Sequence, residues 1–461
     1  MKAGPAGRVF AHNSRAFQLV RTLLTDRSNH AHSQRAAGTA FLIRIGNAAV
    51  AFVSQILLAR WMGSYEFGVY VYVWTWVLLV GGVIDFGLGT TAQRLIPEYT
   101  EVKALSQLRG YVAGSRWATF VLASLVAIVA AVAIKLFDRR LNDFVVLPLY
   151  LACVALPLYG LNVVQDGIAR AYNWVMLALL PMYIVRPLMI LALMLVAYAA
   201  GFPMSALSAV IVAVVATWVT TILQAVVLNR RLQSAIERGP KSYEFGKWLS
   251  ISLPVFMVGS FYYLLTYTDV LVLQQFRSPS EVAVYFVVTK VIALVAFIYF
   301  AVSVAVAHRF AEYNAAGDRE GMAAFLAESI RWTFWPSFMA MIVILALGRP
   351  ILSLFGPEFV IGYPPLVVLA VGFLARGAVG PAERLLNMLG EQKLCAVVYA
   401  GAFACNLIAC ILLIPRFGMT GAAIATSVAL LVESSALFLV TKFRLGFHVF
   451  VWGGSIAKAS I

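Results

Sequence analysis

The chain has 461 residues, of which 62% are hydrophobic and only 12% are charged, and its mean hydropathy is +0.88. A soluble domain usually carries about 25% charged residues, so this composition predicts a polytopic membrane protein. The formal charge of +15 does not indicate nucleic-acid binding, because most Lys and Arg lie between apolar runs rather than on one solvated face.

Residues 1–38 form a basic tail, in which five arginines accompany a single acid, Asp26. An Arg-rich, acid-poor start resembles a transit peptide. It also fits a disordered cytoplasmic tail that contacts anionic lipid headgroups, and this is the interpretation we favour.

Twelve apolar runs follow the tail, each about long enough to cross a bilayer as a helix. They lie at about residues 39–60, 69–92, 113–135, 145–166, 174–199, 205–228, 249–275, 281–307, 330–348, 364–388, 393–415 and 420–442. Short polar turns join them. The sequence therefore predicts an all-α polytopic membrane protein with about twelve transmembrane helices. No nucleotide-binding glycine motif is present, and the four cysteines lack the spacing of a metal site, so we expect no cofactor and no metal.

The distribution of Lys and Arg predicts the orientation of the chain. These residues are concentrated in the two tails and in the even-numbered connections, and they are sparse in the odd-numbered connections. By the positive-inside rule, both termini are expected in the cytoplasm.

The longest connection on the predicted cytoplasmic side, residues 229–248, separates two sets of six apolar runs. We expect an N-terminal half at 39–228, a cytoplasmic linker at 229–248, a C-terminal half at 249–442 and a cytoplasmic tail at 443–461. The segment "YEFGVYVYV" around Glu66 aligns with "SEVAVYFVV" around Glu281, 215 residues later. Such a repeat predicts two parallel halves around a central cavity. Twelve helices in two halves would also fit a major-facilitator transporter.

Four sequence blocks distinguish between these folds. In order, they are "ARWMGSYEFGVY", "DFGLGTTAQR", "TDVLVLQQFRSPSEVAVYFVVTKV" and "NLIACILLIPRFGMTGAAIATSVA". Their order and spacing resemble those of Wzx-type polysaccharide flippases, which belong to the multidrug/oligosaccharidyl-lipid/polysaccharide exporter superfamily. The resemblance covers about residues 39–442 and departs from the family pattern at Ala283, where glycine is usual. The major-facilitator signature is not apparent between the second and third apolar runs.

The resemblance implies a flippase rather than an enzyme. Its implied substrate is a polyprenyl-pyrophosphate-linked oligosaccharide, which moves from the cytoplasmic to the outer leaflet of a bacterial inner membrane by alternating access. The resemblance also implies contact with membrane lipids, and it suggests a polymerase and a chain-length regulator of the same polysaccharide pathway as partners. In the family, a cationic cavity lined by helices 1, 2, 7 and 8 receives the anionic head of the substrate.

Charged residues inside the apolar runs are the candidate site residues, because membrane-embedded charges face the bundle interior, where they pair or bind something. Arginine matches the geometry of phosphate oxygens and lysine acts as a compact charge, so we interpret the bases as substrate-binding residues and the acids as charge partners or coupling residues. The bases are Arg44, Arg186, Lys290 and Arg376, and the acids are Asp85, Asp269 and Glu433.

Mutual neutralisation is the alternative interpretation of these charges. Similar depths in the membrane would allow Arg44 to pair with Asp85, Lys290 with Asp269, and Arg376 with Glu433. Asp85 also lies between Gly81 and Gly89 at intervals of four residues, which favours close helix packing along that stripe. Arg186, between Pro181 and Pro187 at an expected bend, has no evident partner.

Two other functions are considered. A cation-coupled small-molecule or multidrug antiporter of the same superfamily would be expected to hold an acid-rich site. Among the deep charged residues here, the bases outnumber the acids. A membrane enzyme of sugar-lipid assembly is disfavoured by the short loops and by the lack of a catalytic pair of acids.

Overall fold

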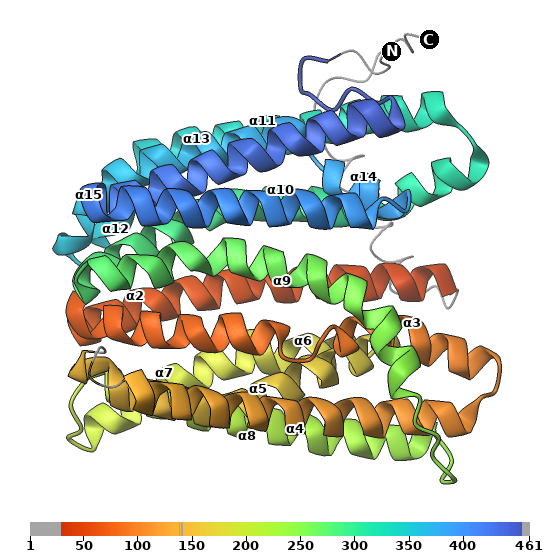
Figure 1. Cartoon of the computed structure of the whole chain (residues 1–461), viewed down its shortest axis with the longest axis horizontal. Coiled ribbons are helices and arrows are strands. Elements are labelled where there is room, and N and C mark those ends of the chain that lie inside the picture. The colour runs from red at the N-terminus through yellow and green to blue at the C-terminus, as the bar shows by residue number, and fades with distance from the viewer. Residues whose placement is uncertain (1–28, 138, 140–141, 454–461) are drawn as a thin grey trace, which may run out of the picture.

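The described part of the chain consists of helices and their connections, without a β-strand (Figure 1). The computed structural model describes residues 29–137, 139 and 142–453, and of residues 29–42, 44 and 304 it describes the backbone alone. Within this part, ten helical segments are long and apolar enough to cross a membrane. Two of the ten are double-length segments that fold back on themselves, at Ile45–Glu101 and Gln392–Leu445. The described chain thus makes twelve crossings, as predicted.

The first six crossings are formed by α2 (Asn29–Val83), α3 (Leu88–Glu101), α4 (Leu105–Phe137), α5 (Asp143–Ala171), α6 (Val175–Leu180), η2 (Pro181–Val185), α7 (Arg186–Ala199) and α8 (Ala206–Ala235). The last six are formed by α9 (Phe245–Phe276), α10 (Pro279–Ala316), α11 (Arg319–Ala346), α12 (Gly348–Ser353), η3 (Pro357–Gly362), α13 (Tyr363–Val379), α14 (Ala382–Met388), α15 (Gln392–Val440) and η4 (Thr441–Leu445).

Single glycines reverse the direction of the chain inside α2 and α15. Gly63 has φ 75° and Gly418 has φ 56°, a region that residues with a Cβ atom adopt only with strain. Each glycine lies in a polar turn that the sequence predicts between two antiparallel helices.

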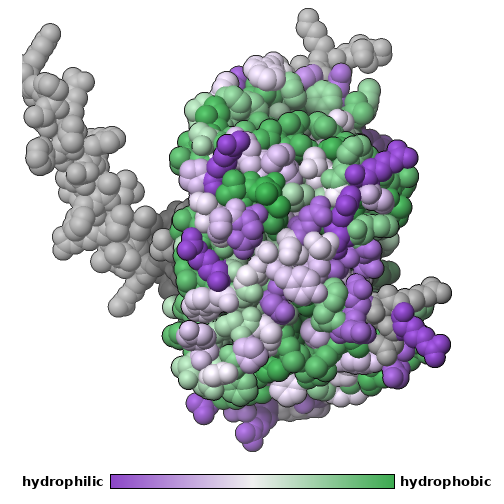
Figure 2. All heavy atoms as spheres, turned by 90° about the vertical axis from the view of Figure 1, so that its left-hand side faces the viewer, coloured by the Kyte–Doolittle hydropathy of each residue, from purple (hydrophilic) through white to green (hydrophobic). Residues whose placement is uncertain are grey.

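The helices run roughly parallel, so the bundle has two ends (Figure 1). We call one the basic end: it carries the connections at 102–104, 172–174, 236–244, 317–318 and 389–391. We call the other the hairpin end: it carries Gly63, 200–205, 277–278, 347–362 and Gly418. Figure 2 looks onto the hairpin end and shows hydrophilic residues interspersed with hydrophobic ones.

The hydrophobic core differs between the two ends. At the hairpin end, one core joins the first and last six crossings, and Phe67 of α2 contacts Phe286 of α10 and Phe359 of η3 edge to face. At the basic end, one core surrounds Tyr111 and Trp248, and a separate core surrounds Phe310 in the last six crossings. The two groups of helices are therefore packed together at the hairpin end, whereas at the basic end α9 is the helix of the last six crossings that joins the core of the first six, through Trp248.

The internal repeat has a physical counterpart at the hairpin end. Glu66 accepts a hydrogen bond from the backbone N–H of Ala206 (2.7 Å), at the start of the sixth crossing. Glu281 accepts one from the backbone N–H of Met419 (3.0 Å), at the start of the twelfth crossing. A carboxylate at a helix N-terminus satisfies a free amide and complements the helix dipole. The two glutamates of the repeat thus perform the same task in the two groups of crossings.

Candidate functional site

The second crossing is broken at Asp85. Helix α2 ends at Val83, and Phe86 and Gly87 have φ angles of 49° and 75° before α3 begins. The buried Asp85 carboxylate accepts hydrogen bonds from the backbone N–H groups of Gly87 (3.1 Å) and Gly89 (2.8 Å). Such bonds to free amides stabilise both the break and the carboxylate. The predicted contact with Arg44 stays a prediction, because the Arg44 side chain lies outside the described residues.

The small-residue stripe around Asp85 packs on α5. A Cβ atom at Gly81 would overlap the ring of Tyr159, and one at Gly89 would lie 2.9 Å from the carbonyl oxygen of Val163. A Cβ atom on Gly167 would overlap the backbone of Gly89. Close packing along the stripe is confirmed, and the partner helix is α5.

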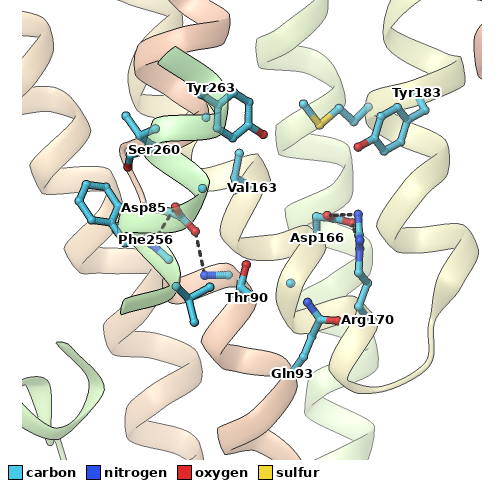
Figure 3. A pocket seen from close by; sticks show the side chains of 18 residues that line it. Asp85, Thr90, Gln93, Val163, Asp166, Arg170, Tyr183, Phe256, Ser260 and Tyr263 are labelled. Carbon is cyan, nitrogen blue, oxygen red and sulfur yellow. Dashed lines mark hydrogen bonds and ion pairs between the residues drawn. The ribbon is translucent and has the colours of Figure 1, made fainter. Parts of the chain in front are cut away.

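A cavity of about 290 Å³ lies beside this break, between α3, α5, η2 and α9 (Figure 3). On the α5 wall, Arg170 forms a two-bond ion pair with Asp166, with Nε–Oδ1 and Nη2–Oδ2 distances of 3.0 and 2.6 Å. Helix α3 contributes Thr90 and Gln93, and α9 contributes Ser260. The sequence alone did not indicate this cavity. The visible signal was the density of polar residues in "DFGLGTTAQR", whose spatial neighbours depend on the fold.

Arg186 begins α7 directly after the π-helical turn η2, at the bend that Pro181 and Pro187 predict. Its guanidinium lies over the ring of Tyr159 at 5.3 Å from the ring centre. An aromatic face attracts a cation without neutralising it.

Lys290 and Asp269 do not pair with each other. The Asp269 carboxylate is buried and accepts hydrogen bonds from the hydroxyls of Tyr285 (2.6 Å) and Thr426 (3.0 Å) and from the backbone N–H of Val270 (2.8 Å). The Lys290 ammonium lies 4.4 Å from the ring centre of Phe286. The direct ion pair that similar depths suggested is not formed, since Tyr285 and Thr426 bond to the carboxylate, but Asp269 and Lys290 remain close enough to attract each other electrostatically.

Arg376 and Glu433 form the third predicted pair, and this one is present. Arg376 Nε lies 3.4 Å from Glu433 Oε1, and neither atom forms a hydrogen bond. Glu433 is completely buried, and the Arg376 guanidinium also lies over the ring of Tyr299 at 4.9 Å. Across the described residues, neither Arg186 nor Lys290 forms an ion pair with a carboxylate.

The sequence analysis did not predict the polar contacts around Asp269. Tyr285 of α10 and Thr426 of α15 donate hydrogen bonds to the carboxylate. Asn406, on the other crossing of α15, bonds to Thr426. The available signal was the presence of these polar side chains inside apolar runs. In the described part of the chain, no three His, Cys, Asp or Glu side chains form a group that could hold a metal ion.

A family model described as "Polysaccharide biosynthesis protein" matches residues 35–314. The chain belongs to this family. A second family model, MatE, matches residues 254–412 of the same chain. A probable low-salt glycan biosynthesis flippase, Agl15 of Haloferax volcanii, is 25% identical over 178 residues, which span 38% of this chain and 37% of that relative.

Solved structures show the same fold at low sequence identity. A multidrug resistance MATE family transporter in an inward-facing conformation has a TM-score of 0.71 and 13% identity, over 87% of this chain and 94% of that one. The lipid II flippase MurJ has a TM-score of 0.67 and 16% identity, over 88% and 87% of the two chains. The fold class and the predicted resemblance to this transporter superfamily are confirmed.

Proposed function

We propose that this protein is a flippase for a polyprenyl-pyrophosphate-linked oligosaccharide, which it moves from the cytoplasmic to the outer leaflet by alternating access. The observation that carries the proposal is that Arg186 and Lys290 rest on aromatic rings and form no direct ion pair with a carboxylate among the described residues. A pyrophosphate crossing the membrane needs fixed cations part-way, because its charge is poorly solvated there. Membership of a polysaccharide biosynthesis family supports the same substrate class.

The packing of the two ends supports alternating access. The predicted halves, 39–228 and 249–442, share a large core at the hairpin end, whereas at the basic end α9 alone joins the core of the first half and the other helices of the second half pack around Phe310. We assign the basic end to the cytoplasm, since Lys and Arg are concentrated there. With that end in the cytoplasm, this conformation would receive the substrate from the cytoplasmic leaflet of a bacterial inner membrane. Outward opening would then separate contacts such as the one between Gly68 and Pro279.

The deep acids have different proposed roles. We assign Asp269 and Glu433 to coupling, because both are buried in the last six crossings, where Asp269 bonds to α10 and α15 and Glu433 pairs with Arg376 of α13. The two backbone hydrogen bonds of Asp85 suit a structural role at the break in the second crossing. Arg44 and Arg376 remain candidates for substrate binding. Membrane lipids, a polymerase and a chain-length regulator of the same pathway remain the proposed partners.

Transport in reconstituted vesicles tests the proposal. Purified protein would be placed in liposomes with the lipid-linked oligosaccharide that accumulates in a strain lacking the gene, and outward movement would be measured with a glycan-modifying enzyme. A hydrogen bond from a charged donor contributes about 1.5–3 kcal/mol, so Lys290→Ala or Arg186→Ala should slow flipping by roughly tenfold to a hundredfold. Lys290→Arg should retain part of the rate, whereas Lys290→Gln should not. Wild-type rates in the Lys290→Ala/Arg186→Ala double variant would refute the cationic mechanism.

The second candidate function is a cation-coupled small-molecule or multidrug antiporter, which the MatE match and the MATE-like fold favour. Drug efflux from cells that express the protein distinguishes the two. Efflux that Lys290→Ala does not affect, without lipid flipping, would favour the antiporter.

A further inference from the structure

We propose that the cavity beside Asp85 binds a sugar ring of the lipid-linked glycan, while the pyrophosphate binds the basic residues elsewhere in the bundle. This inference rests on the proposed function and assigns the two parts of the substrate to two different sites. The cavity volume of about 290 Å³ is at the small end of ligand-binding pockets, which suits one part of a ligand rather than all of it.

The charges of the cavity argue against a phosphate ligand. Its ionisable carboxyl and guanidinium groups are those of Asp85, Asp166 and Arg170. Both nitrogens of the Arg170 ion pair are engaged by Asp166, at 3.0 and 2.6 Å. The other feature that attracts anions, the N-terminus of α3, is also occupied, because Asp85 accepts hydrogen bonds from Gly87 and Gly89. An incoming phosphate would therefore meet carboxyl groups and a guanidinium that is already paired with one of them.

The remaining groups of the cavity suit a neutral molecule with many hydroxyls. Thr90 and Gln93 are exposed on α3 and offer a hydroxyl and an amide, which both donate and accept hydrogen bonds. Opposite them, the Ser260 hydroxyl of α9 is buried and has no hydrogen-bond partner. A buried hydroxyl without a partner is unfavourable, and a ligand that bonds to it removes that cost. Carboxylate oxygens can accept additional hydrogen bonds from sugar hydroxyls.

Aromatic rings cover the part of the cavity next to α9. Phe256 stacks on Phe86 with ring centres 4.6 Å apart and an angle of 9° between the ring planes. Tyr263 and Tyr183 line the cavity further along, as Figure 3 shows. Each tyrosine combines an apolar ring with a polar hydroxyl. A sugar ring has the same combination, with C–H faces and hydroxyl edges.

Two substitutions remove the site by different means, and each has a matched control. A Cβ atom at Gly259 would meet no atom within 4 Å, so Gly259→Leu should fill the cavity with little strain. Gly246 on the same helix has equally open surroundings outside the cavity, so Gly246→Leu is its control. Gln93→Leu removes the amide at similar size, and its control is Gln233→Leu, at an exposed glutamine of α8.

The experiment compares three probes on purified full-length protein. They are the lipid-linked oligosaccharide, polyprenyl pyrophosphate without sugar, and the oligosaccharide released from its lipid. We expect Gly259→Leu and Gln93→Leu to weaken binding of both sugar-containing probes by about tenfold or more, the range of lost buried hydrogen bonds, and to leave polyprenyl pyrophosphate binding unchanged. The two control variants should bind all three probes like the wild type. Lys290→Ala should weaken the two pyrophosphate-containing probes only.

Equal losses for all three probes, or wild-type binding of the sugar-containing probes by Gly259→Leu, would overturn the inference. A protein that binds the released oligosaccharide through this cavity but flips no lipid in vesicles would refute the proposed function and leave the sugar site standing.

Discussion

The ion pair between Arg376 and Glu433 yields a quantitative prediction about stability. The Glu433 side chain has no exposed surface, the Arg376 side chain is 17% exposed, and the Nε–Oε1 distance is 3.4 Å. Removing one member of a buried pair leaves an uncompensated charge and typically costs about 3–5 kcal/mol. Replacing both members by apolar residues of similar volume is often neutral or stabilising. Arg376→Met and Glu433→Leu should each destabilise the protein by that amount, and the double variant should recover.

The assay is thermal unfolding of each purified variant in detergent, followed by tryptophan fluorescence, together with flipping in vesicles. The exposed pair Arg309–Glu312, at 4.0 Å, is the control, and Arg309→Met should change stability by less than about 1 kcal/mol. A double variant as unstable as either single variant would refute the reasoning that mutual neutralisation is what stabilises the pair. A recovered double variant that flips lipid normally would remove Arg376 from the substrate-binding residues. A recovered variant that does not flip lipid would support that role.

Three further predictions concern topology and helix packing. A reporter fused after Gly239 should lie in the cytoplasm and one fused after Gly201 outside, and the same side for both would contradict the twelve-crossing arrangement. Gly167→Val should lower the melting temperature, because a Cβ atom at this position overlaps the backbone of Gly89. Gly401→Val, in open surroundings, should leave the melting temperature unchanged, and equal effects of the two substitutions would argue against the α3–α5 contact. Asp85→Ala should lower the protein level in the membrane because two backbone amides lose their acceptor, and adding Arg44→Ala should not restore it. Restoration by the second substitution would show that Asp85 acts mainly by neutralising Arg44.

Much of the fold could be predicted from the sequence because the relevant signals are local. Apolar runs of bilayer length identify the crossings, and polar turns with glycine mark the reversals at Gly63 and Gly418. The similar segments around Glu66 and Glu281 indicated the internal repeat. In the structure, each glutamate accepts a hydrogen bond from the start of the sixth crossing of its own group. The charged residues inside the crossings were equally visible.

The partners of those charges depended on the tertiary structure. Sequence position determines how deep a residue lies along its helix, because the rise of about 1.5 Å per residue is constant. It does not determine which helix lies opposite, or which side chain of that helix bonds to the charged group. Asp269 and Lys290 match in depth, yet the Tyr285 hydroxyl of α10 and the Thr426 hydroxyl of α15 bind the carboxylate, and the ammonium lies on Phe286. The cavity between α3, α5 and α9 has the same origin, because its walls come from helices far apart in the chain.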